Sequence, residues 1–340
     1  MNKKVLVTGG AGYIGSHTVV ELSKAGYRPI IIDNLSNSSK SVITRLEKLC
    51  EQKIPFYNIN CTNQKEMDKA EIWEDIQGVI HFAAHKSVSD SVKNPKKYFL
   101  NNVGSTKVLL KIMKTNKIEN LVFSSSCTVY GEPSKLPVTE ENVIKKSTSP
   151  YAETKQECEK IIQNSSLNNY AILRYFNPIG AHQSSLIGEL PVKTPNNLVP
   201  LITQNAIEQK NKLIIYGNDY NTPDGTCVRD YIHVCDVAKA HVKVLEKLIS
   251  KNRKKKYILN IGLSKGVSVL ELIKLFEKVN KININYQIGE RRQGDIEKIY
   301  ANCKLAKIEL GWSPEKSIED ALLDAWNWAK KIHQKDNLYI

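Results

Sequence analysis

A tyrosine and a lysine four residues apart give this chain its clearest candidate for chemistry. Tyr151 and Lys155 stand in the run SPYAETK, and their spacing places both on one face of a helix. A tyrosine with a pKa of about 10 is a poor proton acceptor at neutral pH, and a neighbouring ammonium would lower that pKa. Ser126, in the preceding run SSSCTVYG, could complete a proton relay. The arrangement predicts a general base.

The pattern is weak when taken alone, because a tyrosine and a lysine at helical spacing are most often a solvated helix face. The surrounding sequence favours the catalytic interpretation. Residues 4–8 predict a short strand, and the run GGAGYIG with Gly9, Gly12 and Gly15 follows at once. A glycine turn between a strand and a helix lets backbone N–H groups approach a pyrophosphate.

The acid at the end of the second predicted strand indicates which dinucleotide would bind. Residues 28–32 form that strand and end in Asp33, eighteen residues beyond Gly15. A carboxylate there accepts a hydrogen bond from a ribose 2′-hydroxyl but repels a 2′-phosphate, and no arginine occurs in the next ten residues. The sequence therefore predicts NAD rather than NADP as the cofactor.

The predicted elements alternate between strands and helices through the first half of the chain. Strands are expected at 54–59, 78–84, 121–124 and 170–175. Helices are expected at 16–24, 64–76 and 95–116, and the helix that carries Tyr151 and Lys155 should continue toward Gln163. This alternation predicts an α/β fold with a doubly wound parallel sheet, a Rossmann domain. Asp33, Phe82 and Ser126 all follow strand ends, where ligands bind in such sheets. His81 lies within an apolar strand, so we expect it to be a packed core residue.

The pattern changes after residue 175, where prolines and glycines interrupt it. Later elements are expected at 213–217, 229–233, 234–249, 257–261, 269–279 and 318–332. We expect residues 1–175 plus 231–261 to form the NAD-binding Rossmann domain. Residues 176–230 plus 262–340 would form a smaller α/β substrate domain.

Composition limits the classes of function. With 340 residues, 41% of them hydrophobic, the chain reads as a soluble globular protein, and no apolar run reaches the ~20 residues of a membrane span. The seven cysteines are scattered and suggest neither disulfides nor a metal site, so we expect a cytoplasmic protein without a metal. The net charge of +14 comes from dispersed lysines, which argues against a nucleic-acid partner.

Over nearly its whole length the chain resembles the UDP-glucose 4-epimerase family of the extended short-chain dehydrogenase/reductase superfamily. The motifs that carry the resemblance are GGAGYIGSH at the N-terminus, SSSCTVYG at 124–131, SPYAETK at 149–155, LRYFNPIGAH at 173–182, PNNLVP at 195–200, YGNDYNTPDGTCVRDYIHV at 216–234 and RRQGD at 291–295. The run at 216–234 is the most discriminating of these.

The resemblance implies roles for residues at matching positions. Tyr151 would take the proton from the sugar 4-hydroxyl, Lys155 would lower its pKa and hold the nicotinamide ribose, and Ser126 would bridge Tyr151 and substrate. Besides these three, the positions expected to bind NAD are Gly9, Gly12, Tyr13, Ile14, Gly15, Asp33, Asn34, Leu35, Asn60, Cys61, Phe82, Ala83, Ala84, Lys86, Asn102 and Phe176. Besides Ser126 and Tyr151, those expected to bind the UDP-sugar are Asn177, Asn197, Leu198, Ile214, Tyr216, Arg229, Arg292, Asp295 and Ile299.

The implied reaction interconverts UDP-galactose and UDP-glucose through a 4-keto sugar, with a hydride transferred to bound NAD and returned to the other face. Two positions depart from the family pattern. Asn60 stands where an acid near the adenine is usual, and Ala83 and Ala84 stand where Gly-Leu is common before the lysine. An amide oxygen can still accept a hydrogen bond, but without charge.

Three other functions fit the fold. A nucleotide-sugar 4,6-dehydratase needs an acid–base pair after the strand-end serine, where this chain has Cys127 and Thr128. A UDP-glucuronate decarboxylase is a nearer rival. A non-catalytic NAD-binding scaffold would not need to keep both Tyr151 and Lys155.

The resemblance also implies a homodimer and a pocket wall. The helix expected at 95–116 and the helix that carries Tyr151 would pair across a two-fold axis, through apolar residues on their exposed faces: Val103, Leu110, Cys158 and Ile162. Ile299 falls where the family has a wall of the sugar pocket. An isoleucine is smaller than a tyrosine, so UDP-N-acetylglucosamine and UDP-N-acetylgalactosamine could also be accepted, although Ile299 could equally be a packing residue.

Overall fold

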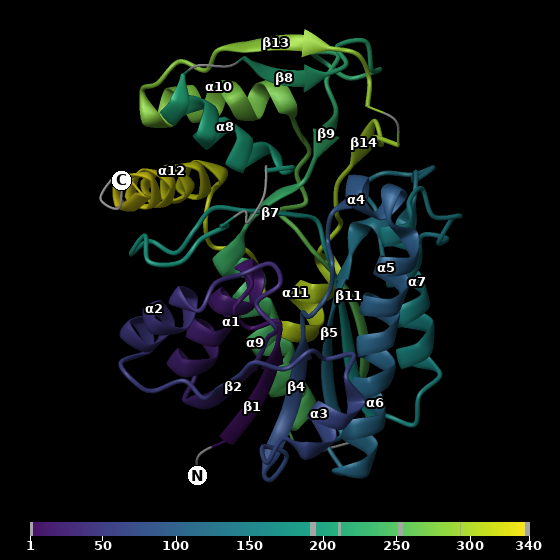
Figure 1. The fold of residues 1–340 in the computed structure, drawn as a ribbon. Coiled ribbons are helices and arrows are strands. Elements are labelled where there is room, and N and C mark those ends of the chain that lie inside the picture. Colours follow the sequence, from purple (N-terminus) through teal and green to yellow (C-terminus); the bar gives the residue numbers. More distant parts are fainter. Residues whose placement is uncertain (1–2, 191–194, 210–211, 251–253, 293, 337–340) are drawn as a thin grey trace.

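A parallel sheet of seven strands forms the body of the molecule (Figure 1). The structure is a computed structural model that describes residues 3–190, 195–209, 212–250, 254–292 and 294–336. The strand order is β11-β6-β5-β4-β1-β2-β3, and every neighbouring pair is parallel. The strands are β1 (Lys3–Thr8), β2 (Tyr27–Ile32), β3 (Phe56–Tyr57), β4 (Ile76–His81), β5 (Asn120–Ser126), β6 (Asn169–Tyr175) and β11 (Lys256–Ile261). The order reverses between β1 and β4, so the turns after these two strands flank the crevice where such sheets bind ligands.

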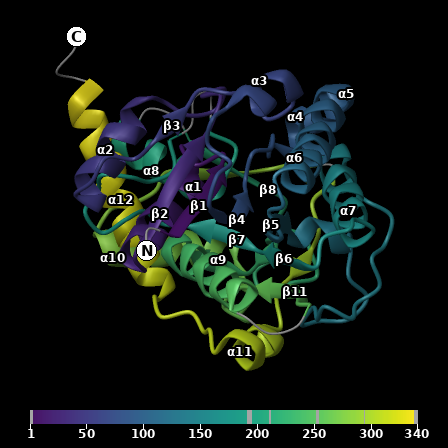
Figure 2. The same cartoon turned by 90° about the horizontal axis from the view of Figure 1, so that it is seen from below.

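Helices cover both faces of this sheet, as the view from below shows (Figure 2). One face carries α1 (Tyr13–Lys24), α2 (Ser41–Cys50), α9 (Val234–Ile249) and α11 (Lys304–Leu310). The other carries α3 (Gln64–Lys69), α4 (Val88–Lys93), α5 (Pro95–Tyr98), α6 (Gly104–Thr115) and α7 (Pro150–Gln163). The doubly wound Rossmann fold expected from the sequence is confirmed.

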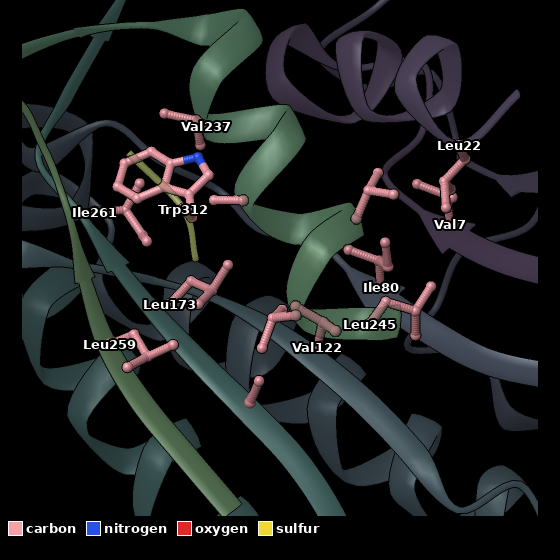
Figure 3. Close-up of a cluster of buried hydrophobic side chains, with 14 of the residues drawn as sticks. Val7, Leu22, Ile80, Val122, Leu173, Val237, Leu245, Leu259, Ile261 and Trp312 are labelled. Atoms are coloured by element: carbon pink, nitrogen blue, oxygen red, sulfur yellow. The ribbon is translucent and has the colours of Figure 1, made fainter. Parts of the chain in front are cut away.

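The two cores follow from the alternation of side chains along each strand. Val5 and Val7 of β1 belong to the core cluster under α1 and α9, whereas Leu6 between them belongs to the cluster under α6 and α7. In Figure 3, Val7, Ile80, Val122 and Leu173 from neighbouring strands lie toward Val237 and Leu245 of α9. Strands buried on both faces explain the continuous apolar runs in the sequence.

A second group of elements lies beyond the carboxyl ends of the sheet (Figure 1). It contains α8 (Leu198–Glu208), α10 (Val269–Asn280) and α12 (Ile318–Asp336), which share a third hydrophobic core. Its strands pair as β7 (Asn177–Ile179) with β10 (Tyr231–His233), β8 (Leu213–Tyr216) with β13 (Tyr286–Gly289), and β9 (Val228–Arg229) with both β12 (Val267–Ser268) and β14 (Lys298–Ile299). The division into the two domains given above stays a prediction.

Three predicted elements differ from the structure. The helix expected at 64–76 ends at Lys69, because the chain turns back and the Trp73 indole donates to the Met67 carbonyl over 3.0 Å. The strand expected at 54–59 shortens to Phe56–Tyr57. The helix expected at 95–116 is interrupted by a π-helical segment, Phe99–Val103, between α5 and α6.

His81 is a packed core residue, as expected, with Thr8 and Thr106 as hydrogen-bonding partners. None of the described helices is long and apolar enough to cross a membrane.

Candidate active site

The start of α7 places the predicted base against the end of β5. Ser149 caps the helix by accepting from the Ala152 N–H over 3.2 Å, and Pro150 fills the first helical position. Tyr151 and Lys155 on the inner face are 9% and 4% exposed. Ser126, at the end of β5, acts on Tyr151 and lowers the pKa of its hydroxyl.

Thr128, which no motif marked as a site residue, fixes the position of Ser126. The Thr128 backbone N–H and hydroxyl both donate to Ser126 Oγ, over 3.2 and 3.0 Å. These two hydrogen bonds hold the Ser126 hydroxyl at the end of β5, where it lowers the pKa of Tyr151. The structure thus brings together all three predicted catalytic residues.

Burial dominates the electrostatics of this group. It lowers the pKa of Lys155 to about 8, against the charges of Cys158 and Glu159, which raise it. Burial and then the neighbouring Tyr175 raise the pKa of Tyr151, while the hydrogen bond with Ser126 lowers it. Lys155 Nζ lies 5.9 Å from the centroid of the Tyr151 ring. Burial therefore opposes the predicted lowering of the Tyr151 pKa by Lys155, and that lowering stays a prediction.

The glycine turn forms a tight cradle at the start of α1. Gly9 has a φ of 71°, and a Cβ there would lie 2.7 Å from the Ala83 backbone nitrogen. A Cβ on Gly15 would lie 2.2 Å from the Gly9 oxygen. Gly12 begins the helix without a side-chain cap, and no acid stands in the first turn, which contains Tyr13 and Ile14. Uncapped N–H groups at a positive helix end suit the pyrophosphate of a dinucleotide.

Asp33 is fixed beside this turn. Its Oδ2 accepts from the Ala11 N–H over 3.1 Å and its Oδ1 from the Leu35 N–H over 2.8 Å. Burial raises the pKa of Asp33, and these backbone hydrogen bonds lower it. The Ser38 hydroxyl also donates to Oδ1, over 3.3 Å, whereas Oδ2 has one donor and keeps a lone pair to which a ribose hydroxyl could donate. The residues present thus fit NAD.

The predicted adenine-side residues follow β2 and β3. Asn34 is exposed, and Leu35 has a φ of 56°. Asn60 Oδ1 accepts from the Thr62 N–H and hydroxyl over 3.0 and 2.9 Å, so the amide oxygen stabilises the loop in which Asn60 lies. Cys61 is buried, and burial and then the charge of Asp33 raise the pKa of its thiol to about 12.

Asn102 ties the loop after β4 to α7. That loop contains the predicted residues Phe82, Ala83, Ala84 and Lys86, all partly or fully accessible. Asn102 Oδ1 accepts from the His85 N–H over 2.8 Å, and its Nδ2 donates to the Thr154 hydroxyl over 3.1 Å. Asn102 lies in the π-helical segment, a type of irregularity that often occurs at functional sites.

A second cluster gathers four of the predicted substrate residues. Arg292 donates to Asp295 from Nε and Nη2, over 3.2 and 2.7 Å, and Arg229 Nη2 lies 3.9 Å from Asp295 Oδ1. The Arg292 guanidinium carbon lies 5.6 Å from the centroid of the Tyr216 ring. Two cations that share one carboxylate leave a net positive charge, which suits a diphosphate.

The remaining predicted residues vary in accessibility. Asn197 is exposed and Leu198 is half-buried at the start of α8, Asn177 is half-buried in β7, and Ile214 is 42% exposed on β8. Phe176 and Ile299 are 4% and 2% exposed. Ile299 packs in the core cluster beneath α9 and pairs in register with Arg229, so its role as a pocket wall stays a prediction.

Glu189 joins the two groups of predicted residues, although no sequence pattern marked it. Its Oε1 accepts from Lys86 Nζ over 2.5 Å and from Asn197 Nδ2 over 2.7 Å. The Trp328 indole N–H donates a hydrogen bond to the Glu189 backbone carbonyl over 2.9 Å. An ion pair between loops so distant in the chain becomes visible only in the folded structure.

Comparison with known proteins identifies the family. Residues 5–262 match the NAD dependent epimerase/dehydratase family. The chain belongs to this family. Among curated members of the family, a UDP-glucose 4-epimerase of Dictyostelium discoideum is 46% identical over 332 residues, which cover 96% of each chain. A UDP-glucose 4-epimerase of Bacillus subtilis is 44% identical over 328 residues, which cover 95% of this chain and 96% of that one.

A solved structure of the family, UDP-glucose 4-epimerase from Bifidobacterium longum in complex with NAD+ and UDP, superimposes with a TM-score of 0.91 at 42% identity. The match covers 96% of this chain and 98% of that chain. The comparisons confirm the Rossmann fold and the NAD cofactor that the sequence of this chain predicts.

Proposed function

We propose that this chain is a UDP-glucose 4-epimerase, which interconverts UDP-galactose and UDP-glucose with NAD held in the glycine turn. The observation that carries the proposal is the buried pair of Tyr151 and Lys155, one helical turn apart on α7, with Ser126 of β5 acting on Tyr151. It lies at the carboxyl end of β5 in a chain that is 46% identical to an enzyme of that name. NAD, when bound, would supply the chemistry of a hydride acceptor that can also return the hydride.

Tyr151 acts on the proton of the sugar 4-hydroxyl. Ser126 lowers the pKa of Tyr151, which favours the ionised form of the phenol. The positive charge of the buried Lys155 ammonium also favours the ionised form of this phenol. After the hydride has left and returned, Tyr151 gives the proton back to the oxygen at the inverted carbon. The stereocentre changes without net oxidation.

Arg229, Arg292 and Asp295 hold the UDP group. The sugar must turn over between the two hydride transfers, so the firm contacts have to be made to the nucleotide. Forked guanidinium donors suit a diphosphate, and Asp295 positions both forks before the substrate arrives. Tyr216, Asn177, Asn197, Leu198 and Ile214 complete the proposed nucleotide and sugar contacts.

The competing functions are less well supported. Cys127 and Thr128 stand where a dehydratase needs an acid and a base, and burial raises the pKa of the Cys127 thiol to about 12. The Thr128 hydroxyl is engaged with Ser126. A non-catalytic scaffold gives no reason for the buried Lys155, whose desolvation is unfavourable.

We also propose a homodimer, with a corrected set of contact residues. Val103, Cys158 and Ile162 are not on exposed faces as predicted, because all three pack in the core beneath α6 and α7. The exposed apolar residues near these helices include Val88 at 44%, Val92 at 63% and Leu100 at 74%. Exposed side chains of this size fit a second copy of the chain. Leu100→Glu should therefore lower the mass measured by light scattering to that of a monomer.

Purified protein supplied with UDP-galactose and no added NADH tests the proposed function. We expect UDP-glucose to accumulate to an equilibrium. If the protein instead released carbon dioxide from UDP-glucuronate and left UDP-galactose unchanged, the decarboxylase would be the correct assignment. All seven cysteines are free thiols, which suits the proposed cytoplasmic location.

A further inference from the structure

A buried ion pair lies one helical turn beyond Lys155. Glu159 of α7 and Arg174 of β6 are 1% and 2% exposed. The contact is forked: Arg174 Nε donates to Glu159 Oε1 over 3.0 Å and Nη2 donates to Oε2 over 2.6 Å. Because Tyr151, Lys155 and Glu159 are spaced four residues apart, they follow one another along one face of α7.

Consecutive serines of β5 act on these α7 residues. The Ser124 carbonyl accepts from Lys155 Nζ over 2.7 Å, and the Ser125 hydroxyl donates to Glu159 Oε1 over 2.5 Å. Ser126 lowers the pKa of Tyr151. The helix face that carries the proposed base is therefore hydrogen-bonded to the strand at Lys155 and at Glu159.

The other side of the ion pair is anchored in the core. Arg174 Nη1 donates to the Tyr130 hydroxyl over 3.1 Å, and that hydroxyl donates to Asn260 Oδ1 over 2.6 Å. Asn260 Nδ2 in turn donates to the Val138 carbonyl over 3.0 Å. With these partners, the buried charges have the hydrogen bonds that they require, and Glu159 has little freedom to move.

We propose that the Glu159–Arg174 pair is a positioning device for the reaction: it fixes α7 on β5 and β6, and it places a carboxylate where it favours the Lys155 ammonium beside Tyr151. The inference rests on the proposed function. Glu159 is a positioning residue, because it acts through Lys155 and contacts neither the sugar nor the cofactor in the proposed mechanism.

The charges around Lys155 support this role. Burial lowers the pKa of Lys155 to about 8, and Cys158 and Glu159 are the neighbours that raise it. Burial lowers the pKa of His81 to about 3, so His81 is neutral at working pH. Several titratable and polar groups face Lys155 and Tyr151. They are Tyr151, Cys158 and Glu159 on α7, His81 on β4, the Phe123 ring, the Ser124 carbonyl and Ser126 on β5, Cys127 after β5, Tyr175 on β6 and Tyr98 on α5.

Without Glu159 the Lys155 ammonium would lose a favourable neighbour. In the proposed mechanism, a tyrosinate beside an ammonium competes with a phenol beside a neutral amine. Loss of the carboxylate favours the second arrangement, in which Tyr151 keeps its proton and cannot act as the base. The chemical step would slow, whereas UDP binding at Arg229 and Arg292 would not change.

The test compares Glu159→Gln with Glu157→Gln in the NAD-loaded enzyme. Glu157 is half-buried on the same helix and serves as the matched control. In Glu159→Gln we expect kcat with UDP-galactose to fall about tenfold or more and KM to stay unchanged. This fall in kcat is a fraction of what a positioned base contributes. The Tyr151 tyrosinate is followed by ultraviolet titration, with the Tyr151→Phe variant of each protein as the reference. In Glu159→Gln it should form at a higher pH than in the wild type. Glu159→Asp should restore part of kcat.

Two outcomes overturn the inference. One is a folded Glu159→Gln with wild-type kcat and wild-type tyrosinate titration. Because an unpaired Arg174 could prevent folding, Glu159→Gln/Arg174→Gln is measured as well. In that variant an unchanged kcat per folded molecule and an unchanged titration would be the second overturning result. A wild-type protein without epimerase activity would instead refute the proposed function, and the tyrosinate titration would still test the coupling.

Discussion

The Lys155 ammonium lies 5.9 Å from the centroid of the Tyr151 ring and is 4% exposed. A cation at this distance from a buried phenol favours the ionised form of that phenol. On this ground, and because Ser126 also lowers the pKa of Tyr151, we propose Tyr151 as the base.

Tyr151→Phe should remove the base and leave the nucleotide site intact. We expect kcat to fall by two or more orders of magnitude, roughly the contribution of a positioned acid or base. UDP affinity, measured by calorimetry, should change little. Tyr286→Phe, on the exposed strand β13, serves as the control and should keep full activity. Substantial turnover in Tyr151→Phe would assign the proton transfer to another group.

Arg292→Ala should weaken UDP binding. The lost interaction is a charged hydrogen bond, so we expect a loss of roughly 1.5–3 kcal/mol in binding free energy. The neighbouring Arg291 offers a matched control, because it donates to Asp219 and stacks on Tyr220 instead. Equal UDP affinities for Arg292→Ala and Arg291→Ala would show that the cluster with Asp295 does not bind the diphosphate.

Much of the fold could be predicted from the sequence, because strands buried on both faces appear as apolar runs and α9 matches its expected bounds, Val234–Ile249. Side-chain direction could not be read so well. The interruption of the 95–116 helix by a π-helical segment has no sequence signal and changes which residues face outward, and Val103 turned out to be buried. Of the site, the local patterns around Tyr151 and Asp33 predicted residues that the structure places at the carboxyl ends of β5 and β2, and their roles stay predictions.

Contacts between distant segments were missed for a physical reason. The pairing of Lys86 with Glu189 depends on how two loops meet above the sheet, and nothing in either loop specifies the other. Arg174 could have been noticed, because arginine is scarce in this chain and this one stands in an apolar strand. The partner, Glu159, lies four residues after Lys155.

Stability should decrease in mild acid because of buried histidines. Burial lowers the pKa of His17 to about 3, of His81 to about 3 and of His241 to about 4. The unfolded chain takes up these protons near pH 6.5, so the stabilisation present above that pH is lost as pH falls toward 4, by up to about 1.4 kcal/mol per pH unit for each histidine. Asp230, with a pKa raised by burial to about 6, acts in the opposite direction.

Urea unfolding of the wild type and of His241→Gln at about pH 7 and about pH 5 measures this effect. Nε2 of His241 has no hydrogen-bonding partner among the described residues, so protonation there would leave a buried, unpaired charge. The variant should lose less stability than the wild type between the two pH values. Equal losses would mean that His241 does not contribute to the acid response.

We predict measurable interconversion of UDP-N-acetylglucosamine and UDP-N-acetylgalactosamine, and its loss in Ile299→Tyr with UDP-galactose turnover largely spared. Ile299 is 2% exposed, so thermal unfolding must first show that the larger side chain is tolerated. Ile299→Leu, of equal volume, is the control. A wild-type enzyme inert toward both N-acetylated sugars at about millimolar concentration would show that another wall closes the pocket.

The central claim is that the hydrogen at the sugar C4 leaves and returns within one site that keeps its NAD. UDP-galactose with deuterium at C4 tests this most directly, in protein to which no NADH has been added. We predict UDP-glucose that carries the deuterium at C4, with no hydrogen gained there from water. Product that had lost the label to solvent, or no conversion at all, would contradict the account.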